Sequence, residues 1–255
     1  MRFRAAVLIS LLAAAPLSAQ EISNLESARP VTMEDAVPIE VGAYSASADY
    51  AYARRVDRVD YAGPAFSVVG GVLPGVELGA ESRLLTNPRL NARRGIGSGD
   101  LDVHVLGALH RESASAPALA ARIDAILATG FASHGTNLVG ELIATRSFET
   151  FRIHGSAGIL YVGSPRIGQR DGPFFATAGV DVRPFGAWRT DTLAMADVVV
   201  RQSVNSGGKL SVGLELGLKQ RVGFRTFFYA GMASEVVGES DRLRYRGVLG
   251  LTHTF

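Results

Sequence analysis

The sequence predicts an all-β fold, a transmembrane antiparallel up-and-down β-barrel of about 12 strands, and three observations support this prediction. Apolar and polar residues alternate with period two along most of the chain, as in a strand with one lipid-facing side. The chain begins with a segment typical of a secretory signal peptide. No later segment is apolar over the ~20 residues that a membrane-spanning helix needs, so a closed barrel is the remaining way to cross a membrane.

The composition excludes several other classes of protein. The 255 residues include no Cys, which excludes a disulfide-stapled domain and a thiolate metal site. The net charge of +2 includes Arg2 and Arg4, which lie in the expected signal peptide; without them, 24 basic residues balance 24 acidic ones. A nucleic-acid-binding domain needs a basic surplus, so we expect no nucleic acid among the partners.

The first 40 residues divide into a signal peptide and a lead-in. Residues 1–4 carry positive charge, residues 5–17 are uncharged and mostly apolar, and Leu17-Ser18-Ala19 is a suitable cleavage site. We therefore predict a signal peptide over 1–19, export through the inner membrane, and localisation in the bacterial outer membrane. Residues 20–40 are expected as a periplasmic N-terminal lead-in, although the sequence leaves open a position inside the barrel mouth. Residues 41–255 are expected to form the barrel.

Twelve segments of alternating residues are expected to form the strands. The clearest runs from Lys209 to Lys219, where every even position is Leu or Val and every odd position is Gly or polar. Most segments exceed the ~9–11 residues of a tilted membrane-crossing strand, whereas soluble strands usually have about 5–6 residues. The expected strands are 41–54, 60–72, 75–85, 98–111, 118–130, 136–148, 151–162, 173–184, 191–202, 209–219, 221–233 and 241–255.

The connections and the aromatic residues fit the same barrel. Short turns are expected at Pro74-Gly75, Glu149-Thr150 and Gln220 on the periplasmic side, and longer loops at 86–97 and 163–172 on the outer side. This asymmetry is typical of outer-membrane barrels, as are aromatic girdles at the two membrane interfaces. The predicted girdle residues are Phe148, Phe151 and Phe255 at the periplasmic rim, and Tyr52, Phe131, Tyr161 and Phe174 at the outer rim.

The positions that are expected to face the lumen carry charges of both signs. The last strand carries a basic ladder of three arginines and closes against the first strand, which supplies Asp49. Two interpretations remain open: opposed charges make a polar constriction for small solutes, or they pair and close the lumen as a salt-bridged plug. The candidates for the constriction are Arg242, Arg244, Arg246, Asp49, Glu81, Arg83, Asp100 and Asp102.

We expect no catalytic residues, no metal site and no cofactor. Ser156 lies two residues from His154 on the same predicted face, but this spacing arises often by chance. A lipid-acting hydrolase would need a His/Ser pair on the lipid face, where His253 has no obvious Ser, Asp or Asn beside it. His104 and His110 are about 20 Å apart along one strand, so they cannot share a metal ion.

Several segments resemble known proteins. Gly250 and the terminal Phe255 resemble the signal that the outer-membrane barrel assembly machinery reads, although His253 stands where a hydrophobic residue is usual. Other segments are similar to the outer-membrane family named for the meta-pathway of phenol degradation, namely ARPVTMEDA at 28–36, GVELG at 75–79, GSGDL at 97–101 and GTNL at 135–138. This resemblance covers most of the chain after the signal peptide. It implies a channel-like barrel associated with hydrophobic or aromatic compounds, without catalytic residues.

Together these observations predict an outer-membrane channel or transporter-like barrel for the passage of small, hydrophobic or aromatic compounds. The alternative is a structural or adhesive barrel with a closed, salt-bridged lumen, which presents its outer loops to a partner. The expected partners are outer-membrane lipid, the barrel assembly machinery and a small-molecule solute. Pore conductance distinguishes the two interpretations.

Overall fold

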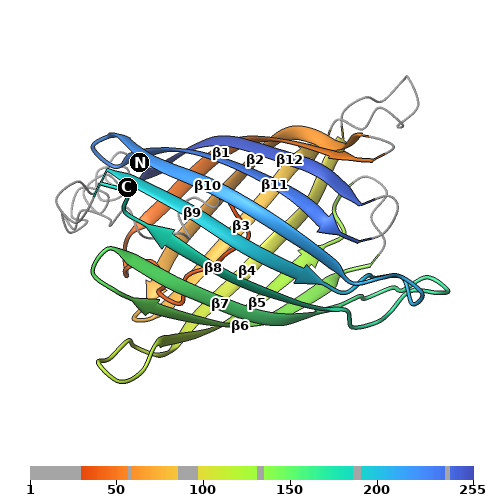
Figure 1. The fold of residues 1–255 in the computed structure, drawn as a ribbon, viewed down its shortest axis with the longest axis horizontal. Helices are drawn as coiled ribbons and strands as arrows, with labels where there is room; N and C mark the ends of the chain where they lie inside the picture. Colours follow the sequence, from red (N-terminus) through yellow and green to blue (C-terminus); the bar gives the residue numbers. More distant parts are fainter. Residues whose placement is uncertain (1–29, 57–58, 86–96, 131–134, 186–190, 239–241) are drawn as a thin grey trace, which may run out of the picture.

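The structure is a computed structural model that describes residues 30–255 except for 57–58, 86–96, 131–134, 186–190 and 239–241. Over the described residues, twelve antiparallel strands form one closed sheet, in which each strand pairs with its neighbours in sequence and β12 pairs with β1 (Figure 1). The start of β1 and the end of β12 lie at the same rim, because Ser45 pairs with Thr254. The predicted antiparallel barrel is confirmed.

The strands are 9 to 15 residues long, which is enough for a tilted strand to cross a membrane. Most of their ends agree with the predicted segments to within a few residues. Their bounds are β1 (Tyr44–Arg55), β2 (Val59–Leu73), β3 (Val76–Leu85), β4 (Gly97–His110), β5 (Ala118–Leu127), β6 (Asn137–Ser147), β7 (Phe151–Tyr161), β8 (Phe174–Val182), β9 (Thr192–Arg201), β10 (Ser211–Gly223), β11 (Thr226–Val237) and β12 (Leu243–Thr254).

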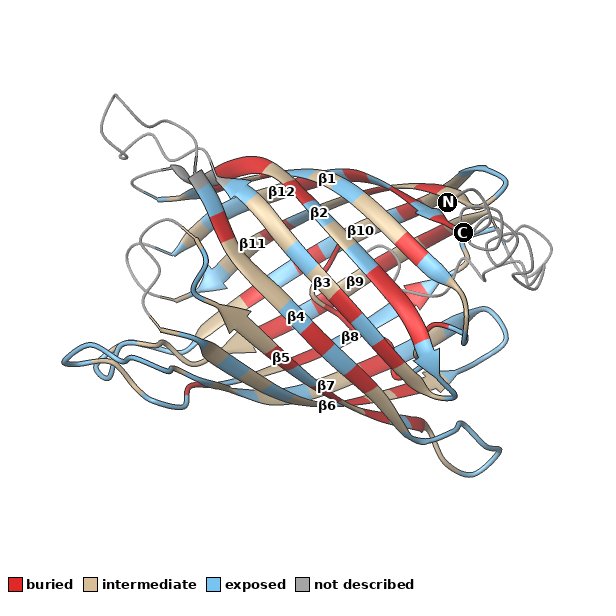
Figure 2. Ribbon diagram, turned by 180° about the vertical axis from the view of Figure 1, so that it is seen from behind, coloured by how far each residue is buried: buried red, intermediate tan, exposed pale blue. Residues whose placement is uncertain are grey.

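The outer face of the barrel is apolar, as contact with lipid requires. Leu214, Leu216 and Leu218 of β10 are 48%, 55% and 40% exposed, although their strand is paired on both sides. Glu215, which lies between two of them, points inward and is buried. Figure 2 shows the same alternation of buried and exposed residues along the other strands. No helix among the described residues is long and apolar enough to span a bilayer.

Aromatic side chains lie near both rims of the barrel. Phe148 and Phe151 stack at the turn between β6 and β7, with 4.5 Å between their ring centroids. Phe255 is exposed at the same end of the barrel. At the opposite end are the exposed side chains of Tyr161 and Phe174, and Tyr52 stacked on Tyr245. The predicted rim residue Phe131 lies outside the described residues.

The turn between β10 and β11 lies four residues beyond its predicted position. The sequence predicts it at Gln220, but the turn is Phe224-Arg225, between the paired residues Gly223 and Thr226. Gln220 continues β10, and its side chain accepts a 2.6 Å hydrogen bond from Thr192 of β9. Arg225 has a positive φ of 122° in this turn. The prediction was wrong because period-two alternation continues up to a tight hairpin turn and does not mark it.

Residues 30–41, which we call the luminal segment, lie inside the barrel. The segment leaves the lumen at Val41, which bridges to Gly71 near the end of β2, and the chain then enters β1. The sequence predicts a periplasmic lead-in over residues 20–40, and the described part of this region takes the alternative position within the barrel. The buried apolar side chains of the segment, each at most 3% exposed, are Val31, Met33, Ala36 and Ile39.

Candidate functional site

The luminal segment is fixed to one wall of the barrel through its own backbone. It is not part of the sheet, so its N–H groups need other hydrogen-bond partners. Glu215 of β10 accepts the N–H of Thr32, and Asp197 of β9 accepts the N–H of Met33, both at 2.7 Å. Glu215 and Asp197 are register partners on adjacent strands. Two neighbouring carboxylates therefore hold two consecutive peptide groups, which replace the water that each carboxylate loses.

The opposite wall holds the other end of the segment in the same way. Glu77 of β3 accepts the N–H of Ile39 at 2.9 Å and lies 3.3 Å from His104 Nε2 of β4. Glu77 is fully buried, and His104 is 5% exposed. A buried carboxylate is tolerated only when such partners surround it. The segment is thus anchored on both sides of the lumen.

Two of the three acidic side chains of the segment pair with arginines of the wall. Glu34 lies 3.3 Å from Arg122 of β5, and Asp35 accepts a 2.5 Å hydrogen bond from Arg152 of β7. Arg122 also donates to Asp124 at 2.6 Å. Arg122 and Asp124 are two residues apart on one strand, so they share the luminal face. Acidic side chains of the wall therefore accept hydrogen bonds from the backbone of the luminal segment, and arginines of the wall pair with the acidic side chains of the segment.

A buried hydrogen-bonded chain leads from Arg152 back to the luminal segment. Arg152 donates to Asp181 of β8 at 2.6 Å, and Asp181 lies 2.8 Å from His154 Nε2. His154 Nδ1 lies 3.0 Å from the Thr145 hydroxyl of β6, which accepts the N–H of Ala36 at 3.0 Å. The five residues come from three strands and the segment. Networks in which every member has a partner are rigid and specific, so this chain fixes the position of residues 35 and 36.

Apolar contacts complete the docking of the luminal segment. One cluster consists of Val31 and Met33 with Leu193, Met195 and Phe227 of the wall, and another of Ala36 with Leu106, Ala118, Ala120 and Ile143. These wall residues face the lumen, where strict alternation in a water-filled pore predicts polar residues. They are apolar because the segment covers them.

Buried side chains line the lumen at the end of the barrel that carries the short turns, where the luminal segment docks. They come from all twelve strands of the described barrel. Examples at most 3% exposed are Ser45, Glu77, Leu106, Ala118, Ile143, Thr145, His154, Asp181, Leu193, Lys219, Phe227, Thr252 and Thr254.

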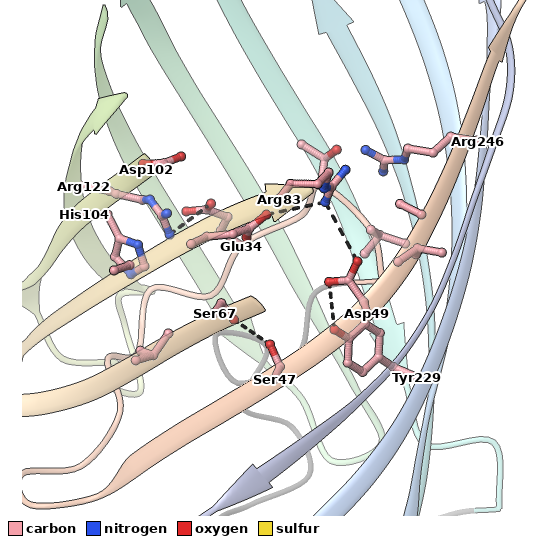
Figure 3. A pocket seen from close by; sticks show the side chains of 17 residues that line it. Glu34, Ser47, Asp49, Ser67, Arg83, Asp102, His104, Arg122, Tyr229 and Arg246 are labelled. Atoms are coloured by element: carbon pink, nitrogen blue, oxygen red, sulfur yellow. Dashed lines mark hydrogen bonds and ion pairs between the residues drawn. The ribbon is translucent and has the colours of Figure 1, made fainter. Parts of the chain in front are cut away.

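A cavity of about 240 Å³ remains between the luminal segment and the walls formed by β1–β5, β11 and β12 (Figure 3). Its lining is mostly polar, with a few apolar patches such as Val69 and Val248. The polar lining consists of Ser47, Asp49, Ser67, Glu81, Arg83, Asp102, His104, Arg122, Tyr229 and Arg246 of the wall, with Thr32 and Glu34 of the luminal segment.

Two arginines of the cavity, Arg83 and Arg246, are more exposed than Arg122 and Arg152, which bind the luminal segment. Arg83 lies 3.9 Å from Asp49 and 3.4 Å from Glu81, and its side chain is 25% exposed. Arg246 is equally exposed and binds Glu215 at 2.9 Å. Asp49 interacts electrostatically with both arginines, and Figure 3 shows the two guanidinium groups pointing toward one another. Two like charges thus share one small polar space.

Gly250 shapes one wall of this cavity. Tyr229 donates to Asp49 at 3.2 Å, and its ring lies where a Cβ at position 250 would be. Gly250 is the register partner of both Asp49 and Tyr229 in the adjacent strands. Glycine at this position therefore lets the tyrosine lie flat against β12 and reach the carboxylate. The role of Gly250 and Phe255 in barrel assembly stays a prediction.

The structure brings five of the eight predicted constriction residues together in the cavity: Asp49, Glu81, Arg83, Asp102 and Arg246. The other three lie elsewhere. Asp100 accepts the N–H of Gly130 at 2.9 Å near the outer end of β4, and Arg242 and Arg244 are exposed at the outer end of β12. The expected ladder therefore does not extend along the cavity, because β12 lines it at Arg246 and Val248, and Arg242 and Arg244 lie nearer the outer end of the strand.

Sequence reasoning left open the position of the residues that narrow the lumen from within. Glu34 and Asp35 stand among Val31, Met33 and Ala36, an acidic pair within an apolar stretch. A solvated lead-in does not need buried apolar side chains, so this composition was a usable signal of an internal position. Tyr229 was missed because aromatic residues were assigned to the rims.

The catalytic alternative gains no geometric support. His154 binds Thr145 and Asp181, and the Ser156 hydroxyl has no hydrogen-bond partner among the described residues. Within the same residues, no group of three or more His, Cys, Asp or Glu side chains is placed to hold a metal ion.

Comparisons with known proteins give matches only at the level of structure. No protein-family model matches the chain, and no curated protein sequence matches it. Among solved structures, an outer membrane channel from Pseudomonas putida F1 superimposes with a TM-score of 0.65 at 11% identity, over 88% of this chain and 100% of that one. The NanC porin gives 0.59 at 11% identity over 81% and 98%, and the KdgM porin gives 0.58 at 10% over 82% and 99%. At such identities the similarity is one of fold.

Proposed function

We propose that this chain is an outer-membrane channel for small solutes and that the luminal segment closes its periplasmic end. The observation that carries the proposal is the cavity of about 240 Å³, whose charged side chains remain accessible within the barrel. Side chains can fill the interior of a small barrel completely, and a purely structural barrel has no use for accessible charge there. Rings of charged side chains are a common means of selecting solutes. The fold shared with a channel and two porins supports the same proposal.

The resemblance to the phenol-degradation family suggests hydrophobic or aromatic cargo. The cavity lining further restricts the chemistry of that cargo. Its apolar surface is limited to a few side chains such as Val31, Val69 and Val248, and the remainder is mostly charged or hydroxylic. A purely apolar solute would desolvate these charges without replacing their hydration. The proposed cargo is therefore a small molecule that carries at least one charged group, whether or not it has an aromatic ring.

The proposed location is the bacterial outer membrane. The apolar outer face and the aromatic rims support it, and the end with short turns would face the periplasm. The signal peptide proposed for residues 1–19 lies outside the described residues. The proposal includes no catalytic step and no cofactor.

A closed structural barrel is the second candidate, and one observation favours it. The pairs that tie the luminal segment to the wall, such as Arg152 with Asp35, are short and almost fully buried. If they never open, no solute crosses, and the outer loops carry the function.

Single-channel recording separates the two candidates. Residues 20–255 would be refolded in detergent and inserted into a planar bilayer. Discrete current steps are expected from a channel, with a fraction of open time set by the luminal segment. Silence from a protein that is folded, as judged by its heat-modifiable mobility on a gel, would favour the closed barrel.

A further inference from the structure

We infer that the wall of the lumen is a binding site for short acidic peptides and that the luminal segment occupies this site as an intramolecular ligand. The expected ligand is a non-helical peptide in which two consecutive acidic residues stand between small or apolar ones. The inference rests on the proposed function, in which the luminal segment can leave the wall, and it names a class of ligand for the same lumen.

The wall binds groups that every peptide carries. Four N–H groups of the luminal segment, those of residues 32, 33, 36 and 39, donate to side chains of the wall at 2.7–3.0 Å. The acceptors belong to β10, β9, β6 and β3 in that order, so the segment crosses the lumen from one wall to the other. Main-chain hydrogen bonds give a peptide-binding site its affinity, and side-chain pockets give it specificity.

Two arginines make the site selective for acidic residues. Arg122 of β5 lies 3.3 Å from Glu34, and Arg152 of β7 binds Asp35. The two arginine side chains are only 6% and 12% exposed, and each also pairs with an acidic residue of the wall. A guanidinium has five donors, so one wall carboxylate orients it while a ligand carboxylate binds it as well. A neutral ligand side chain would lose the charge-assisted part of this contact.

Apolar contacts on either side of the acidic pair set the position of the peptide along the wall. Met33 is 1% exposed and packs in one apolar cluster, and Ala36 is 1% exposed in the other. Residues 31–36 therefore make three of the four N–H contacts, both arginine contacts and both apolar contacts. This six-residue stretch, Val-Thr-Met-Glu-Asp-Ala, is the core of the expected ligand.

The luminal segment has an advantage over a free peptide, because its connection to β1 keeps its local concentration high. A short tether gives an effective concentration on the order of millimolar. A free peptide competes at lower concentrations only when the segment itself binds more weakly. The double variant Glu34→Gln/Asp35→Asn weakens the segment and leaves the wall unchanged, so it should accept a free peptide. Met33→Ala weakens the segment by removing an apolar contact and serves as a second variant of this kind.

Fluorescence anisotropy with a labelled synthetic peptide of residues 30–41 tests the site on the refolded chain in detergent. The peptide should bind Glu34→Gln/Asp35→Asn at least about tenfold more tightly than the wild-type chain, because the competing segment has lost two charged contacts. Met33→Ala should also bind it more tightly than the wild type does. Heat-modifiable mobility verifies that each variant is folded. Equal binding to wild type and variants, or no binding to either variant, would overturn the inference.

Altered peptides identify the groups that the wall recognises. One carries Glu34→Gln and Asp35→Asn, and another is N-methylated at Met33, which removes the N–H that Asp197 accepts. Each should bind the double variant about tenfold more weakly than the native peptide does. A scrambled peptide of the same composition and charge is the matched control and should not bind saturably. Equal binding of the scrambled peptide would show attraction by charge alone and would overturn the inference.

The two proposals fail separately. Current steps in a bilayer without peptide binding would leave the channel standing and remove the peptide site. Peptide binding without any current would leave the site standing and remove the channel.

Discussion

Two regions of the lumen use the same residue types with opposite results. Where the luminal segment docks, Arg152 and Asp181 lie 2.6 Å apart, and their side chains are 12% and 3% exposed. In the cavity, Arg83 and Asp49 lie 3.9 Å apart, with side chains 25% and 14% exposed. A buried pair must be short and fully hydrogen-bonded to offset its desolvation, whereas a hydrated pair contributes little. The first arrangement holds structure in place, whereas in the second the charged side chains are partly exposed within the cavity.

The largest effect is expected from Arg152→Ala. This change leaves the buried carboxylates of Asp35 and Asp181 without their arginine, which should lower the free energy of unfolding by about 3–5 kcal/mol. Urea unfolding in detergent micelles measures it. Arg244→Ala is the control, because that arginine is exposed. A decrease of less than about 1 kcal/mol in the free energy of unfolding would contradict the distinction between buried, stabilising ion pairs and hydrated ones.

Met33→Ala should have the next largest effect. Met33 is 1% exposed and packs with Leu193 and Phe227, so its truncation should cost about 2–3 kcal/mol and loosen the luminal segment. The fraction of open time in single-channel recordings should rise with it. Met232→Ala, on the lipid face at 61% exposure, provides the comparison. Identical unfolding curves for both variants would mean that the segment contributes nothing to stability.

Thr145→Val removes one hydroxyl from the buried chain. Ala36 N–H and His154 Nδ1 both lose a partner, at an expected cost of about 1–3 kcal/mol in the same unfolding assay. Thr226→Val is the matched substitution, since Thr226 bonds His253 at an exposed site. The account would be weakened by equal costs at the two positions.

The smallest effects on stability are expected on the cavity side, where the effect on selectivity should be largest. Arg83→Gln should change the free energy of unfolding by less than about 1 kcal/mol. Arg246→Gln should shift the pore toward cations, whereas Arg242→Gln and Arg244→Gln should not, because only Arg246 lines the cavity. Reversal potentials in a salt gradient measure these shifts. A shift from the outer two arginines would restore the full ladder that the sequence predicts.

The sequence was informative about the fold wherever one face of a strand meets lipid. A shift of one residue in strand register would turn Leu214, Leu216 and Leu218 into the lumen. The alternation therefore determines which side chains of β10 face the lipid. The same rule could not locate the turn at Phe224-Arg225, because alternation does not change at a tight hairpin. Alternation also does not predict an apolar side chain on the luminal face, such as Phe227, which packs against Val31 and Met33 of the luminal segment.

The candidate site was predictable only in part, for a different reason. Strand parity correctly places Asp49, Glu81 and Arg246 on the luminal face. Parity does not say how far along the barrel a residue lies, so it could not separate Arg246 from Arg244. It says nothing about a segment without strand pairing, and the contacts of Glu34 with Arg122 join residues far apart in sequence.

The central claim is that the luminal segment controls passage, and a reversible cross-link tests it most directly. The chain has no Cys, and a Cβ at Gly217 would lie against Val31, so Val31→Cys/Gly217→Cys can form a single disulfide between segment and wall. Single-channel current would be recorded with the disulfide oxidised and then reduced. We predict that openings are suppressed in the oxidised form and return on reduction. Equal currents in both forms, with the disulfide verified by mass spectrometry, would contradict the claim.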